Sequence, residues 1–317
     1  MFPSSDAPAT AASTAWMNGI AFQANTGHLW IHTSTGTSQD LGLAMMADTS
    51  PSIVPAPPSA VAFQANTGNL WITSAGTGQD LGLAMMAGTS PSITSLSGGG
   101  WVVAYQENVG NLWITSGGTP QDQGLAMMAG TSPSITGLLA GEWVVAFQGS
   151  NSNLWIHTSR GISQDLDLGM MPGTSPSITS LLFRNLHGAL LAHGWIVAFQ
   201  ANTGNLWIRT SGGISQDLEL GMMEETSPSI THWPPDQWMV AFQANTGNLW
   251  TRESSGASQD LELGMMHGTS PSIAASPGTA WVVASQAATT SLWINTFPGT
   301  GQDQGLGMMT TTSPSAR

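Results

Sequence analysis

Indole and carboxamide side chains return along this chain at nearly regular intervals. In the segment 62–71, AFQANTGNLW, a glutamine precedes a polar turn, and an asparagine and a tryptophan follow the turn. An indole can stack on the apolar face of a pyranose ring, and carboxamides can hydrogen-bond to its hydroxyl groups. These residue types favour non-covalent recognition over covalent chemistry.

The candidate ligand-binding residues are the glutamine, asparagine and tryptophan positions of the copies that keep this polar turn. They are Gln23, Asn25, Trp30, Gln64, Asn66, Asn69, Trp71, Asn108, Asn111, Trp113, Gln200, Asn202, Asn205, Trp207, Gln243, Asn245, Asn248 and Trp250.

Pairs of acidic residues are the main pattern that could indicate catalysis. Asp165 and Asp167 are one residue apart, which places both on one side of a strand, and the pattern returns twice later in the chain. A glycosidase needs two carboxylates across a cleft, so these repeated pairs are expected to be a solvated face. The chain shows no zinc-binding helix motif, nucleophile elbow or calcium loop, so we expect no catalytic residue, no metal ligand and no cofactor.

The elements that position these residues are internal repeats. The glutamines that anchor the copies recur every 41 to 52 residues, and a tryptophan, a Gln-Asp pair and a Met-Met…Ser-Pro-Ser run keep step with them. Near-constant spacing of this length is typical of repeat architectures. The anchoring glutamines are Gln23, Gln64, Gln106, Gln148, Gln200, Gln243 and Gln286.

Each unit reads as four short β-strands. In the third unit, strands are expected over 101–106, 111–115, 121–127 and 133–136, separated by Gly, Pro, Ser and Asn. Four strands per repeat predict one antiparallel sheet per repeat, which is a propeller blade. The fold class predicted is therefore all-β: a seven-bladed β-propeller of four-stranded antiparallel blades.

The two ends of the chain predict how the ring closes. The repeat begins at residue 16 in the register of a second strand, and the chain ends on Ser313-Pro314-Ser315, which begins an inner strand in every other unit. The C-terminal strand should therefore join blade one and remove the free edges. We expect an N-terminal extension over 1–15 and a single propeller domain over 16–317.

Strand alternation sorts the loops onto two faces. The Asn-Thr-Gly hairpins and the Met-Met-x-Gly-Thr-Ser connections share one face, and their sequences repeat almost verbatim. Loops normally diverge faster than cores, and a repeated loop face suits a multivalent binder of a small ligand. We expect each site to lie between a hairpin and the Met-Met-x-Gly-Thr-Ser loop beside it. The other face carries variable loops, including the insertion at 181–195.

Seven near-identical blades of about 42 residues, each with an aromatic residue after a polar hairpin, resemble the bacterial seven-bladed propeller lectins typified by the Photorhabdus lectins. Tachylectin and tectonin propellers are more distantly similar. The resemblance covers residues 16–315 and implies carbohydrate binding between blades. Lectins of that family usually carry a Trp-x-Trp-Glu type strand where this chain has Gln-Asp-Leu-Gly-Leu, so the resemblance does not extend to fucose specificity.

Each candidate position also has a structural interpretation. The tryptophans can pack between blades, tight hairpins require Asn and Gly, and the Gln-Asp pair can tether backbone. Hairpins four and seven have lost the Asn-Thr-Gly motif, so we expect weak or empty sites there. The alternatives to a lectin are a structural or protein-interaction propeller and, less favoured, a glycosidase-type enzyme.

Composition narrows the partners. Hydrophobic residues make up 41% of the 317 positions and can form a large core, whereas only 7% are charged. The net charge of −13 opposes nucleic acid and anionic lipid, so glycans or glycoconjugates are the expected partners, with a homo-oligomer also possible. The sequence shows no Sec-type signal and no span long enough for membrane insertion, which is consistent with secretion by a non-Sec route.

Overall fold

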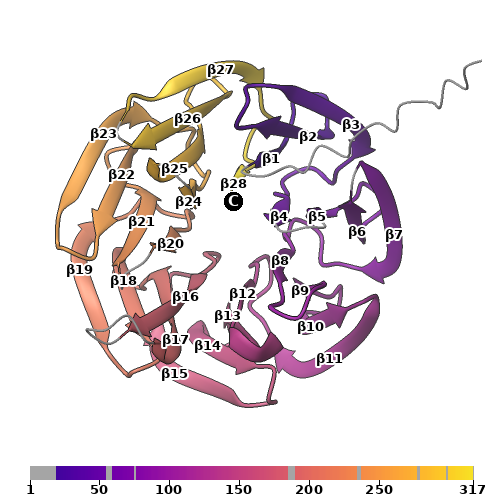
Figure 1. Ribbon diagram of the computed structural model, residues 1–317, viewed down its shortest axis with the longest axis vertical. Coiled ribbons are helices and arrows are strands. Elements are labelled where there is room, and N and C mark those ends of the chain that lie inside the picture. Colours follow the sequence, from indigo (N-terminus) through magenta and orange to yellow (C-terminus); the bar gives the residue numbers. More distant parts are fainter. Residues whose placement is uncertain are drawn as a thin grey trace, which may run out of the picture.

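The computed structural model describes residues 19–54, 59–74, 76–184, 190–233, 237–276, 279–297 and 299–316. Seven four-stranded antiparallel sheets surround a central axis, each with one strand nearest the axis and one at the periphery (Figure 1). The predicted seven-bladed β-propeller is confirmed. The predicted N-terminal extension, residues 1–15, lies outside the described residues.

Each blade runs from an inner strand to an outer strand in chain order, except that blade one takes its inner strand from the C-terminus. The strands are β28 (Ser315–Ala316), β1 (Gly19–Gln23), β2 (His28–Thr33) and β3 (Ser38–Ala44) in blade one; β4 (Ser52–Val54), β5 (Ala60–Gln64), β6 (Asn69–Ser74) and β7 (Thr77–Ala84) in blade two; β8 (Ser92–Ser95), β9 (Trp101–Gln106), β10 (Asn111–Ser116) and β11 (Thr119–Ala126) in blade three; β12 (Ser134–Gly137), β13 (Trp143–Gln148), β14 (Asn153–Thr158) and β15 (Ser163–Gly169) in blade four; β16 (Ser177–Arg184), β17 (Leu190–Gln200), β18 (Asn205–Thr210) and β19 (Ser215–Gly221) in blade five; β20 (Ser229–Trp233), β21 (Gln237–Gln243), β22 (Asn248–Glu253) and β23 (Ser258–Gly264) in blade six; and β24 (Ser272–Ser276), β25 (Thr279–Gln286), β26 (Ser291–Phe297) and β27 (Gln302–Gly307) in blade seven.

The predicted closure is also confirmed. β28 pairs with β1 in antiparallel register, with Ser315 opposite Ala21 and Ala316 opposite Ile20. A two-residue strand from the C-terminus thus completes the sheet that the N-terminal strands begin, beside the axis in Figure 1. This pairing covers part of the inner edge of β1 that another chain could otherwise extend.

Two belts of serine hydroxyls link the blades around the axis. In each Ser-Pro-Ser motif, the hydroxyl of the first serine accepts the backbone N–H of the equivalent serine one blade earlier. The first belt joins Ser50, Ser90, Ser132, Ser175, Ser227, Ser270 and Ser313, and then returns to Ser50. The second serine of each motif accepts a backbone N–H from the inner strand of the next blade, and this belt also closes. The recurring Ser-Pro-Ser sequence is therefore explained by ring closure.

The core lies between blades. Every residue of β5 is buried because the strand has a sheet neighbour on each side and a packed blade on each face. Between blades one and two, Leu29 and Ile31 pack with Val61 and Phe63. The second strand of a blade therefore reads as a continuous apolar run, whereas the outer strand is largely exposed.

The sequence insertion in blade five lengthens a hairpin on the face of the variable loops. β16 and β17 pair from Ser177–Ala198 out to Arg184–Leu190, beyond the ends of the corresponding strands elsewhere. η1 (Leu139–Gly141) is a single 3-10 turn at the same end of blade four. The blades therefore differ more on this face than on the face of the Asn-Thr-Gly hairpins.

Candidate functional site

The predicted glutamines are core residues. Gln64 is fully buried, and its Nε2 donates hydrogen bonds to the carbonyl oxygens of Met85 and Met86 at 3.3 and 3.2 Å. A buried amide cannot reach a ligand at the surface, so these glutamines hold the Met-Met connection in place. This correction removes four residues from the candidate set: Gln23, Gln64, Gln200 and Gln243.

The asparagine that opens each third strand is paired within its own blade. Nδ2 of Asn69 donates to both carboxylate oxygens of Asp80, at 3.2 and 3.1 Å, while Oδ1 of Asp80 accepts the N–H of Gly82 at 2.8 Å. This geometry confirms the predicted tethering of backbone for the aspartate of the Gln-Asp pair. The same pairing holds Asn111, Asn205 and Asn248 to Asp122, Asp217 and Asp260.

The asparagine at the hairpin tip is the exposed member of the predicted set. Asn66 turns its side chain to solvent, while its backbone N–H donates to the carbonyl of Ala44 at 3.2 Å in the preceding blade. The same backbone bond fixes the tips at Asn25, Asn202 and Asn245 to the preceding blade, while their amides stay exposed. The exposed tip residues are Asn25, Asn66, Asn108, Asn202 and Asn245.

A groove opens on this hairpin face between blades four and five. The end of β15 supplies Asp167 and Leu168, and blade five supplies Asn202, Thr203 and Trp207, around a cavity of about 100 Å³. The half-buried indole of Trp207 packs against Phe199, with ring centroids 6.4 Å apart. Trp207 therefore packs at the junction between blades and also lines the groove, so its position fits both the structural and the ligand-binding interpretation.

The equivalent groove between blades three and four is wider. Its cavity measures about 280 Å³ and is lined by Gly124 and Leu125 of β11 and by Ser150, Asn151 and Trp155 of blade four. Oδ1 of Asn151 accepts the Trp155 indole N–H at 3.1 Å, so this amide is held against the wall. Loss of the Asn-Thr-Gly motif was expected to weaken this site, yet the altered hairpin leaves more space.

The second wall of the groove differs from the expected one. The sequence suggested the Met-Met-x-Gly-Thr-Ser loop as the partner of the hairpin, but the end of the preceding outer strand forms that wall. The loop is fixed internally: Oγ1 of Thr89 donates to the Met86 carbonyl at 2.7 Å, and Ser90 belongs to a serine belt. The groove therefore depends on residues such as Asp167 and Leu168 that were outside the candidate set.

Glycines let some tip asparagines lie across the junction. A Cβ on Gly169 would come within 2.6 Å of Nδ2 of Asn202, so only glycine accommodates the amide there. Gly221 and Gly307 receive Asn245 and Asn25 in the same way. Where the strand ends in alanine, as at Ala44 beside Asn66, the amide has to take another position.

Charge on the hairpin face is negative and unevenly distributed. Asp167, Glu219 and Glu262 are exposed and have φ angles of 54°, 58° and 57°, at a position that is glycine in the other four blades. A left-handed conformation costs an L-residue about 1–2 kcal/mol. Beside Asp167, burial alone would raise the pKa of Asp165, but hydrogen bonds from the Asp167 N–H, Asn153 and Asn151 hold that pKa below its ordinary value.

Within the described ranges, no three His, Cys, Asp or Glu side chains are grouped to hold a metal ion. A search of the same part of the chain for a helix long and apolar enough to cross a membrane finds none. The groove offers an aromatic face, an amide, a hydroxyl and, in one case, a carboxylate.

Solved structures with the same fold have low sequence identity to this chain. A triple mutant of AofleA from Arthrobotrys oligospora has a TM-score of 0.58 at 14% identity, covering 83% of this chain and 86% of that one. The Aleuria aurantia lectin in complex with Fucα1-6GlcNAc has a TM-score of 0.53 at 15% identity, with 80% and 92% covered. BBS1N in complex with ARL6DN has a TM-score of 0.59 at 12% identity, with 89% and 88% covered.

These likenesses define the class of fold, a β-propeller. The Aleuria aurantia lectin is a six-bladed propeller, whereas this chain forms seven blades. No protein-family model matches the chain, and no curated protein matches it.

Proposed function

We propose that this propeller is a lectin that binds neutral saccharides in shallow grooves between blades on its hairpin face. The observation that carries the proposal is the groove between blades four and five. An indole, an exposed carboxamide, a hydroxyl and a carboxylate converge there on one cavity, from Trp207, Asn202, Thr203 and Asp167. Such convergence suits a pyranose, which has an apolar face and a rim of hydroxyl groups.

Each side chain has a distinct role in this arrangement. The indole of Trp207 contacts the apolar face of the sugar, the amide of Asn202 donates and accepts hydrogen bonds, and the Asp167 carboxylate accepts hydroxyl hydrogens. Hydrogen bonds to a charged group contribute about 1.5–3 kcal/mol and neutral ones about 0.5–1.5 kcal/mol. The cavity is small, so a single groove binds weakly, and repetition around the ring supplies avidity.

Charge selects against anionic glycans. The chain carries a net charge of −13, and Asp167 stands at the groove itself. A sialylated or sulfated ligand would meet unfavourable electrostatics without a basic residue to offset them. Neutral or N-acetylated saccharides are therefore the proposed ligands.

The solved lectins support this proposal through their shared fold. The Aleuria aurantia structure contains a fucosylated ligand, which makes fucosides a reasonable first test. The narrower likeness to the seven-bladed Photorhabdus lectins rests on the blade count and the aromatic residue after each hairpin. Fucose specificity forms no part of the proposal, because the Gln-Asp strand departs from the pattern of that family.

Protein binding is the second candidate function. BBS1N, whose fold is similar, was solved in complex with ARL6DN. The face opposite the hairpins varies between blades and carries the extended β16–β17 hairpin, as a surface shaped for one protein partner would. This alternative predicts a single partner site instead of several similar ones.

Glycan-array binding followed by titration calorimetry tests the proposal. We expect neutral saccharides to bind, sialylated ones not to bind, and the stoichiometry to exceed one ligand per chain. Individual affinities should lie in the millimolar to micromolar range, about −4 to −8 kcal/mol. A stoichiometry of one would contradict repeated sites, and silence across a broad neutral array would favour the protein-binding alternative.

A further inference from the structure

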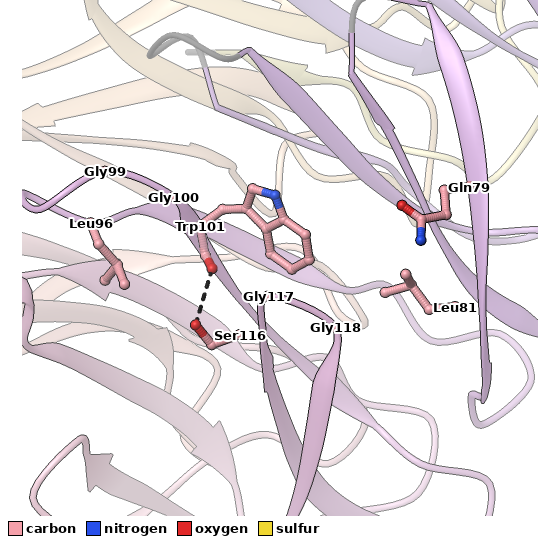
Figure 2. A pocket seen from close by; sticks show the side chains of 9 residues that line it. All are labelled: Gln79, Leu81, Leu96, Gly99, Gly100, Trp101, Ser116, Gly117 and Gly118. Atoms are coloured by element: carbon pink, nitrogen blue, oxygen red, sulfur yellow. Dashed lines mark hydrogen bonds between the residues drawn. The ribbon is translucent and has the colours of Figure 1, made fainter.

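A larger cavity lies on the opposite face, where blades two and three meet. It measures about 320 Å³ and is bounded by Gln79 and Leu81 of β7, by Leu96 and Trp101 at the two ends of the β8–β9 loop, and by Ser116 at the end of β10. Figure 2 shows the Trp101 indole reaching from the start of β9 toward Gln79 and Leu81. The hairpin-face grooves share none of these residues.

Trp101 supplies a fixed aromatic surface. The side chain is half-buried and packs against the core cluster between blades two and three. The hydroxyl of Ser116 donates to the Trp101 carbonyl at 3.5 Å, which ties β10 to the start of β9 (Figure 2). One part of the indole is thus held by the core while the rest faces the cavity.

The cavity is open because neighbouring side chains are small. Thr115 stands opposite Val103, and the matching position in blade four is His157, opposite Val145. The His157 ring lies 5.8 Å from the ring of Trp143, the counterpart of Trp101. In blade seven the counterpart, Trp281, is stacked on Phe297 at 5.3 Å and is only 2% exposed. Blade three has Thr115 and Gly117 at the positions of His157 and Phe297, so neither ring has a counterpart beside Trp101.

The turns that border the cavity are also short and rich in glycine. In blade four, a longer turn brings the N–H of Ser159 onto the Trp143 carbonyl at 3.0 Å, whereas Ser116 and Thr119 of blade three are joined by Gly117-Gly118 alone. Four glycines line the cavity, all with positive φ, and a Cβ on any of them would meet nothing within 4 Å. The rim therefore has space that side chains would otherwise take.

We propose that this cavity is a second saccharide site, which binds a neutral pyranoside with its apolar face on Trp101 and its hydroxyl groups at the Gln79 carboxamide and the Ser116 hydroxyl. None of the lining residues is ionisable, so nothing there compensates a charged ligand. The volume is at the lower end of the range for small-molecule sites, about 300–1,000 Å³, which fits one or two sugar rings. This site does not depend on the hairpin-face proposal.

Crystals of the full chain soaked with methyl pyranosides of galactose, mannose, fucose and N-acetylglucosamine locate the site directly. We expect density for at least one of them against the Trp101 indole and beside Gln79. Sugar at Trp101 with empty hairpin-face grooves would support this site and contradict the proposed function. Sugar in the hairpin-face grooves with none at Trp101 would support the proposed function and contradict this site. Absence of all four from this cavity at saturating concentration would overturn the inference.

Matched variants separate a binding role from a structural one. Gln79→Ala should weaken the calorimetric affinity of this site about two- to tenfold, the equivalent of one hydrogen bond. Gln121→Ala is the control, because Gln121 is exposed and occupies the position equivalent to Gln79 one blade later. At that junction the His157 ring packs beside Trp143, the counterpart of Trp101. Equal effects of the two substitutions would overturn the inference.

A variant that fills the cavity tests the proposal even if the Gln79 amide contributes little to the binding affinity. Ser116 is exposed, so Ser116→Phe should fold normally and fill the cavity, with the loss of one site from the stoichiometry. An unchanged site count with an unchanged unfolding temperature would contradict the proposal. Binding of N-acetyltyrosinamide in place of every pyranoside would also overturn it, in favour of a site for a protein side chain.

Discussion

The serine belts and the hairpin face are both built from repeated sequence, but they repeat in different ways. Around the axis, the same hydroxyl and the same backbone N–H meet at all seven junctions. On the hairpin face, the position of Asp167 is acidic in blades four to six and glycine in the other four, and the hairpin tip carries asparagine, serine or alanine. Invariant chemistry closes the ring, and the varied positions are those at which we propose that the blades differ in ligand binding.

The largest expected effect comes from opening the belts. Truncation after Thr310 removes β28 together with Ser313, which leaves the Ser270 N–H, the Ile53 N–H and two serine hydroxyls without belt partners. We expect a loss of about 3 kcal/mol or more, since several hydrogen bonds and the pairing of blade one disappear together. Thermal unfolding measures it, and an unchanged midpoint would exclude closure by the C-terminal strand.

A single belt hydroxyl should have a smaller effect. Ser132→Ala leaves the N–H of Ser90 without its acceptor, at a present distance of 2.9 Å. This N–H is partly buried, so the loss of its acceptor should cost at most about 1–3 kcal/mol, and the chemical denaturation midpoint should fall while the slope is unchanged. The control is Ser97→Ala, on the exposed β8–β9 loop, which should shift the midpoint far less.

Substitution on the hairpin face should separate binding from stability. Asn66→Ala and Asn245→Ala should each remove one site's hydrogen bonds, about 0.5–1.5 kcal/mol net, and lower the calorimetric site count by one. The fold should tolerate them, because Ala288 occupies this position in blade seven and still donates its N–H to Gly264 at 3.1 Å. If stability falls and the site count does not, these asparagines only form the turn.

The smallest effect concerns backbone strain in the degenerate hairpin. Thr290 has a φ of 71°, where the intact hairpins have glycine. Thr290→Gly should stabilise the chain by up to about 1 kcal/mol, the strain of a left-handed L-residue less the added freedom of the unfolded glycine. Combined with Ala288→Asn it should add a site to the calorimetric count. A restored motif that binds nothing would mean that the asparagine amide is not what the ligand requires.

The sequence predicted the architecture well because the repeat specifies it. Period, strand length and the position of Ser313–Ser315 gave the blade count and the closure that β28 provides. The sequence predicted the residues of the candidate binding site less well. The polar turn beside Gln64 makes it a candidate ligand-binding residue, but β5 is buried along its whole length, including Gln64 at its end.

The second wall of the groove could not be read from the sequence. Asp167 and Leu168 line the groove near the end of β15, on the strand whose register with β14 is shifted by a bulge. The glycine that four blades carry at the position of Asp167 is a local signal for such a bulge, but nothing in the sequence indicates which side chains face the neighbouring blade. The acidic pairs held one clue, since Asp167, Glu219 and Glu262 replace a glycine of the other blades.

Crystals soaked with the neutral saccharide that binds best on a glycan array test the central claim most directly. We predict density on the hairpin face at the junction of blades four and five, with the sugar ring against Trp207 and hydroxyl groups at Asn202 and Asp167. Density at further junctions of the same face should account for the calorimetric stoichiometry. Sugar bound only away from the hairpin face, with all of its grooves empty, would contradict the account.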